Sequence, residues 1–122
     1  MKKITFVILV VFAFTSCYQK AAMEGFDQNQ WLAFTQDCSD YRLKIADHVL
    51  KNSAALLASN QNEIEGLLGA PTEHELYTRN QKFFHYRLTP MDSCGSYGPV
   101  KFLSIRFNAI GRANELELVM RE

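Results

Sequence analysis

Histidine is the side chain best suited to acid–base chemistry near neutral pH, and this 122-residue sequence has three histidines. Asp47 and His48 are sequence neighbours, so on a helix they point about 100° apart and do not face each other. In the Glu-His-Glu sequence at 73–75, a strand puts both carboxylates on one face and His74 on the other. His85 falls on the polar face of its strand, where we expect a solvated side chain. None of the three histidines is expected to face a carboxylate or a nucleophile, so the sequence predicts no catalytic site.

Cys38 lies in an acidic stretch of the sequence. Asp37 and Asp40 are within two residues of it, and acidic neighbours disfavour the thiolate that a nucleophile or a metal ligand needs. The sequence also lacks cysteine pairs at zinc-binding spacing, HExxH, GxSxG and phosphate-binding glycine loops. We therefore expect no enzymatic activity, no metal and no cofactor.

The first sixteen residues have the organisation of an export signal. Lys2 and Lys3 form a positive segment, the apolar run from Ile4 to Phe14 follows, and Thr15-Ser16 supplies small residues before a cleavage site. The eleven apolar residues would rise about 16 Å as a helix, against roughly 30 Å for a hydrocarbon core, so a transmembrane anchor is disfavoured.

The stretch Phe14-Thr15-Ser16-Cys17 resembles the lipobox of bacterial lipoprotein signal peptides, with Phe14 where leucine is usual. The resemblance implies cleavage before Cys17 and attachment of lipid to its thiol. Tyr18, where an aspartate would retain some lipoproteins in the inner membrane, implies the outer membrane, with the protein facing the periplasm. The alternative is an ordinary signal peptide with Cys17 as an incidental thiol. We expect a signal peptide at 1–16, a lipidated tether at 17–25 and a single domain at 26–122.

If Cys17 carries lipid, Cys38 and Cys94 remain as an even pair in an exported, oxidising compartment. The simplest expectation is one disulfide between them. It would close a loop that adds roughly 4 kcal/mol to stability in the chain-entropy model. A reactive thiol or a metal site is the alternative.

The charge balance argues against a nucleic-acid partner. Thirteen Lys and Arg residues match thirteen Asp and Glu residues, and the chain beyond the signal has no run of Lys or Arg. A protein that neutralises phosphates needs such a basic patch. The sequence therefore predicts attachment to a membrane through lipid rather than through charge.

Apolar spacing predicts helices in the first half of the domain. Asp27 can cap a short helix over Gln28–Phe34. Asp40 can cap a second helix, whose apolar stripe consists of Leu43, Ala46 and Leu50 with Ile45 and Val49. A third helix begins at Ser59-Asn60 and ends at Gly69, in a left-handed C-cap position, before Pro71.

Alternation of apolar and polar residues predicts strands in the second half. We expect strands around Leu76, over Phe83–Leu88, over Phe102–Phe107 and over Ala113–Met120. The expected connections are a turn at 78–81, a loop at 90–99 and a hairpin turn at 108–112 that uses Gly111. The result is an α+β domain, with two or three N-terminal helices packed on one face of a three- to four-stranded antiparallel sheet.

The helix Glu63–Leu68 with Gly69-Ala70-Pro71, the strands Phe84–Leu88 and Leu103–Phe107, and Gly111 resemble the helix-LLGxP-strand-strand pattern of the outer-membrane assembly lipoproteins called BamE or SmpA. The layout is also similar to the repeat unit of β-lactamase-inhibitor proteins. The resemblance covers about 60–119. It implies a non-enzymatic binding module whose partner is another envelope protein, and it assigns no binding residue.

Aromatic residues are numerous in the predicted sheet and could contact a partner. Phe83 and Phe102 fall opposite the predicted core faces, and Tyr97 lies in the long loop. We therefore expect Phe83, Phe102 and Tyr97 to form a candidate partner surface, although aromatic residues in a short sheet can also be core. A small periplasmic enzyme, a ligand-binding protein and a structural surface lipoprotein are the alternative functions.

Overall fold

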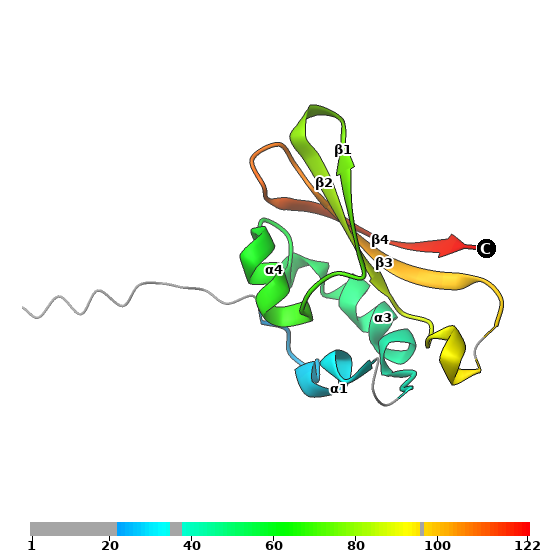
Figure 1. Ribbon diagram of the computed structural model, residues 1–122. Coiled ribbons are helices and arrows are strands. Elements are labelled where there is room, and N and C mark those ends of the chain that lie inside the picture. The colour runs from blue at the N-terminus through cyan, green and yellow to red at the C-terminus, as the bar shows by residue number, and fades with distance from the viewer. Residues whose placement is uncertain (1–21, 35–37, 96) are drawn as a thin grey trace, which may run out of the picture.

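The computed structural model describes residues 22–34, 38–95 and 97–122 (Figure 1).

The first helix, α1, is short and begins after a capping aspartate. Asp27 accepts a hydrogen bond from the Gln30 amide at 3.2 Å, and its bonds to Gln30 lower the pKa of its carboxyl. Helix α1 spans Gln28–Leu32, so it ends two residues before the expected Phe34. Trp31 is fully buried and donates from Nε1 to the Leu68 carbonyl at 2.9 Å.

Helix α3 spans Tyr41–Lys51, and most of the expected apolar stripe faces the core. Its buried residues are Arg42, Ala46 and Val49, whereas Leu43 is 37% exposed. Asp40 occupies the N-cap position but makes no capping bond. Its carboxylate pairs with Lys44 at 3.3 Å instead. The predicted position of the helix was right, and Leu43 is the one residue of the predicted apolar stripe that is exposed.

The burial of Arg42 on this helix was not expected from the sequence. Its guanidinium lies 4.4 Å from the Trp31 ring and 4.2 Å from the Phe34 ring, and it donates to the carbonyls of Trp31 and Arg87. Burial lowers the pKa of Arg42 to about 10, so the group is still charged at neutral pH. An arginine between two aromatic faces therefore joins α1 and α3 to the sheet.

Helix α4 spans Gln61–Leu68, with Asn60 accepting from the Glu63 amide at 2.9 Å. Gly69 ends the helix at φ 75° and ψ −171°, so its φ is positive as expected but its ψ is extended rather than left-handed helical. A Cβ at Gly69 would lie 2.7 Å from Cδ2 of Leu32. Close packing between α1 and the end of α4 thus requires glycine there.

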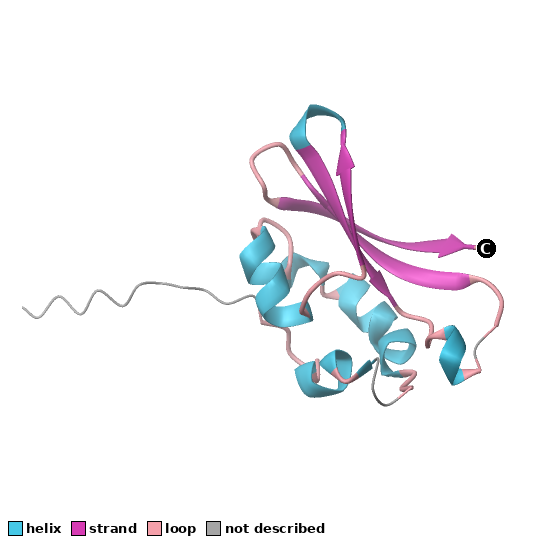
Figure 2. Ribbon diagram, viewed as in Figure 1, coloured by secondary structure: helices cyan, strands magenta, loops and turns pink. Residues whose placement is uncertain are grey.

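The four strands form one antiparallel sheet in the order β1-β2-β3-β4. They are β1 (Glu73–Tyr77), β2 (Gln81–Arg87), β3 (Val100–Phe107) and β4 (Ala113–Arg121). The α-helices gather on one face of this sheet (Figures 1 and 2). The expected α+β class and helix-before-strand order are confirmed.

The core lies between the helices and the inner face of the sheet. Alternate residues of β2 and β3 supply it from the sheet, and the predicted inward positions are buried: Phe84, Tyr86, Leu88, Leu103, Ile105 and Phe107. Gly111 takes φ 80° in the turn between β3 and β4, as expected. The turn between β1 and β2 occupies Thr78–Asn80, and Gln81, expected in that turn, begins β2.

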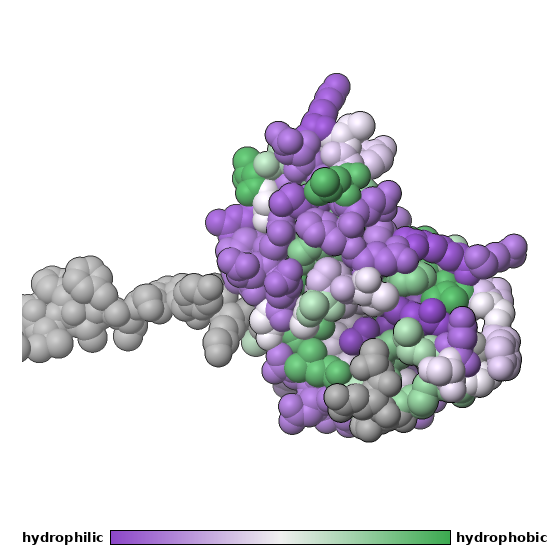
Figure 3. All heavy atoms as spheres, viewed as in Figure 1, coloured by the Kyte–Doolittle hydropathy of each residue, from purple (hydrophilic) through white to green (hydrophobic). Residues whose placement is uncertain are grey.

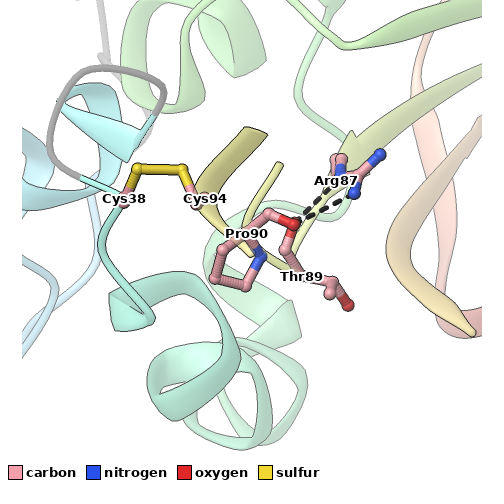
Figure 4. The surroundings of a disulfide bond; sticks show 5 residues. All are labelled: Cys38, Arg87, Thr89, Pro90 and Cys94. Carbon is pink, nitrogen blue, oxygen red and sulfur yellow. Dashed lines mark hydrogen bonds between the residues drawn. A yellow bond between two sulfur atoms is a disulfide. The ribbon is translucent and has the colours of Figure 1, made fainter. Parts of the chain in front are cut away.

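A disulfide joins Cys38 and Cys94, whose Cα atoms are 5.7 Å apart, as expected (Figure 4). It connects the segment before α3 to the loop between β2 and β3. In that loop Arg87 donates to the Thr89 and Pro90 carbonyls at 2.9 and 3.0 Å. The loop is therefore fixed at both its first residues and Cys94.

The fold begins earlier than the sequence indicated. Met23 is 8% exposed and belongs to the core, and His48 donates from Nε2 to the Glu24 carbonyl at 2.7 Å. The expected tether at 17–25 is therefore wrong for its last residues. Cys17 and the signal segment lie outside the described residues.

No helix in the described ranges combines the length and apolarity needed to cross a membrane.

Candidate binding surface on the outer face of the sheet

The face of the sheet opposite the helices is the outer face. In the described part of the chain no α-helix covers it (Figure 2). The register brings together Glu75 and Phe83, His85 and Ser104, and Phe102 and Val119 as neighbours on this face. These residues come from all four strands, so the outer face is where the sheet can combine side chains distant in sequence.

His85 is buried on the outer face, at 5% exposed, and the expectation of a solvated histidine is wrong. Its ring stacks on Phe83 at 5.7 Å between centroids. Nε2 lies 2.7 Å from Oε2 of Glu75, and Nδ1 lies 2.6 Å from Oγ of Ser104. A carboxylate only accepts, so Nε2 carries a proton and donates to Glu75. Glu75 and His85 therefore converge, contrary to the sequence analysis.

A glutamate, a histidine and a serine in a hydrogen-bonded row have the composition of an acyl-transfer site. A nucleophile must also meet its substrate, and Ser104 is 2% exposed with its hydroxyl bonded to the histidine. Glu75, by contrast, has a side chain that is 55% exposed. The row thus buries its serine and exposes its carboxylate, an arrangement that stabilises the outer face and offers no access to a substrate.

Phe102 is also buried, at 5% exposed, so it cannot belong to a contact surface as expected. The guanidinium of Arg121 lies 4.5 Å from the centre of its ring. Arg121 in turn binds the Glu73 carboxylate at 2.5 Å, from the opposite edge of the sheet. This ion pair, together with the ring of His85 at 6.4 Å, covers the phenyl ring.

Phe83 does lie in a partly exposed group of side chains, which we call the outer patch: Tyr77, Gln81, Phe83 and Arg106. Tyr77 is 51% exposed and packs edge-on against Phe83 at 5.6 Å. The Arg106 guanidinium lies 5.9 Å from each of these two rings. Arg106 also donates to Oε1 of Gln81, which holds its guanidinium beside the aromatic pair.

Tyr97 is 87% exposed but stands apart from the outer patch. It precedes β3, whereas Arg106 lies near the end of that strand. Strand rise separates the two by roughly 20 Å or more. Of the three residues expected to form a partner surface, only Phe83 therefore belongs to the outer patch. Arg106 was missed, although its outward position on β3 followed from the alternation that also placed Phe102.

Other surface features carry less chemistry. Leu76 in β1 and Ile110 in the β3–β4 turn are 75% and 81% exposed. Figure 3 shows separate hydrophobic side chains among hydrophilic ones in the upper part of the view, and further hydrophobic surface in the lower part. A depression beside α1 is lined by the consecutive residues 25–29. Within residues 22–34, 38–95 and 97–122, no three His, Cys, Asp or Glu side chains are grouped to hold a metal ion.

No family model, no curated protein and no solved structure matches this chain.

Proposed function

We propose that this chain is a lipid-anchored cell-envelope protein, similar to the BamE or SmpA lipoproteins, that binds another envelope protein without catalysis or cofactor. The N-terminal sequence supports export and lipid on Cys17. The order of helix, glycine-x-proline and strands supports the resemblance. The observation that carries the binding role is the outer patch, an aromatic and arginine group on the sheet face that no described α-helix covers.

The outer patch has the composition of an interaction site. Tyrosine and arginine are the residues that most often dominate binding energy at protein interfaces. Tyr77 and Phe83 are held by each other, and Arg106 is held by Gln81, so little side-chain freedom is lost on binding. Glu115 lies 3.8 Å from Arg106 at the margin and supplies a polar rim.

Two neighbouring positions on one strand give the sharpest test of this surface. A photo-reactive amino acid at Tyr77 samples the outer face, and the same group at Leu76, which is 75% exposed, samples the opposite face of the same strand. Irradiation of intact cells is expected to give one discrete adduct from position 77 and none from position 76. Arg106→Ala is expected to weaken that adduct. Equal adducts from both positions, or none from position 77, would contradict binding through the outer patch.

The anchoring part of the proposal has its own test. The intact mass of the membrane-extracted protein is expected to match a chain that begins at Cys17 and carries acyl groups. The Cys17→Ala chain is expected to leave the membrane fraction, since each buried CH₂ contributes about 0.8 kcal/mol to attachment. A Cys17→Ala chain that stays in the membrane would overturn lipid anchoring and leave the patch experiment unaffected.

A further inference from the structure

The two edges of the sheet differ in their protection against pairing with another strand. β1 is five residues long and carries Glu73 and Glu75, and short length and charge are common protections of an edge. β4 is nine residues long and contains no proline, and its charged residues Glu115, Glu117 and Arg121 are of both signs. Ala113 at its start is covered, because its main chain bonds to Ala58 and Ser59. Beyond Ala113, no segment of the described chain hydrogen-bonds along the outer side of β4.

The hydrogen bonds of β3 show which residues of β4 face this open edge. The Leu88 amide donates to the Lys101 carbonyl at 2.8 Å, so the main chain of Lys101 is directed toward β2. Residues of an antiparallel strand alternate between their two neighbours, so Leu103 and Ile105 are also directed toward β2. Their partners on β4 therefore direct their main-chain groups outward, and those partners are Leu116, Leu118 and Met120.

We propose that β4 pairs antiparallel with β4 of a second copy of this chain, centred on Leu118, so that the two four-stranded sheets join. In this register Leu118 opposes Leu118 of the second copy, and Leu116 opposes Met120. All three residues have free main-chain groups and apolar side chains on the same face. Met120, which is 65% exposed in the single chain, gains an apolar neighbour.

The charges on the other face of β4 fit the same register. Glu115 opposes Arg121 of the second copy, and the two-fold symmetry repeats this pair. Arg121 already binds Glu73, but a guanidinium has five donors and accepts a second carboxylate. Glu117 opposes Val119. A register centred on Glu117 would instead place two glutamates directly opposite each other, which is destabilising. The charges and apolar side chains of β4 are therefore complementary to those of a second copy in this register.

Engineered cysteines in full-length chains test the pairing and its register. Leu118→Cys is expected to give a disulfide-linked dimer on a non-reducing gel of freshly lysed cells, because opposed residues lie within disulfide range. The wild-type chain, with the native cysteines only, sets the background. Leu76→Cys, on the exposed part of the other edge strand, is the matched control and is expected to stay at background. Coexpressed Leu116→Cys and Met120→Cys chains are expected to cross-link with each other and much less with themselves.

A charge reversal separates specific pairing from chance collision. Glu115→Lys in the Leu118→Cys chain faces Arg121 and is expected to lower the dimer yield severalfold, whereas Glu117→Lys, which faces Val119, leaves it nearly unchanged. The thermal unfolding of each variant checks that it is folded. Background yield from both Leu118→Cys and the mixed chains, equal yield from Leu76→Cys, or equal effects of the two reversals would overturn the proposal.

Discussion

Both faces of the sheet bury aromatic residues, but they shield these residues from water in different ways. On the inner face, helices cover an apolar layer in which Phe84 and Phe107 pack at 4.8 Å between ring centroids. On the outer face, no described α-helix provides cover, and Phe102 is shielded by charged side chains from the two edges of the sheet. An uncovered sheet face can therefore build a thin second layer from its own polar residues.

Aromatic residues that are equally buried on the two faces are therefore expected to contribute unequally to the free energy of unfolding. Inner-face atoms are surrounded by packed hydrocarbon, and removing them leaves a cavity. Outer-face atoms are covered by flexible ion pairs that water can replace. Substitutions of matched residues on the two faces measure this difference, and urea unfolding followed through the fluorescence of Trp31, the single tryptophan, is a suitable readout.

Phe107→Ala is expected to give the largest loss, about 4 kcal/mol of unfolding free energy, because Phe107 is fully buried in the inner core. Ile110→Ala is the control three residues later, where the side chain is 81% exposed, and it is expected to change stability by less than about 0.5 kcal/mol. A loss below about 2 kcal/mol for Phe107→Ala would contradict a tightly packed inner face.

Arg42→Met is expected to cost about 3 kcal/mol. The substitution keeps most of the stem between the rings of Trp31 and Phe34 but leaves the carbonyls of Trp31 and Arg87 without their donor. Relief of a buried charge offsets part of this loss. Lys44→Met on the same helix, at a side chain that is 73% exposed, is expected to be nearly neutral in the same urea titration. Unchanged stability for Arg42→Met would mean that the arginine does not join the two layers.

Phe102→Ala is expected to cost about 2 kcal/mol, roughly half of the loss for Phe107→Ala on the same strand. Arg121 can settle into the space, and water can reach what remains, so no closed cavity persists. The comparison is made by urea unfolding of both variants under one condition. Equal losses would show that the outer layer is packed as firmly as the core.

Glu75→Ala is expected to cost about 1 kcal/mol, because it removes the acceptor of the His85 Nε2 proton at a partly exposed site. Glu117→Ala, an exposed glutamate on the same face, is the control and is expected to stay within about 0.5 kcal/mol. If the two variants unfold at the same urea concentration, the Glu75–His85 bond contributes nothing to the outer layer.

Features that depend on neighbouring residues were predictable from the sequence. Asn60 caps α4 and Gly111 turns the last hairpin for reasons within a few residues of each. The period of two in β2 and β3 identified the inner core, since strand geometry fixes which side chains share a face. The order of helices followed by strands also predicted the α+β class, because segregated helices and strands form separate layers.

Burial that depends on distant residues was not predictable in this way. Phe102 was expected on the surface because alternation puts it on the outer face. It is buried because the ion pair of Arg121 and Glu73, which are 48 residues apart in sequence, covers its ring. His85 was expected in water because Glu75 approaches it from another strand. Alternation correctly placed these residues on the outer face, but it contains no information on which side chains will fold back over them.

The burial of Met23 has a further consequence under the proposed lipid anchor. Met23 is the sixth residue after Cys17, and an extended chain spans at most about 3.5 Å per residue, which gives a maximum reach of roughly 20 Å. Because Met23 packs in the core on the helix side of the sheet, the segment that links Cys17 to the domain joins it on the side away from the outer patch. Met23 then lies no further than this reach from the lipid-modified residue, and the outer patch is on the opposite side of the domain, where a partner can approach it.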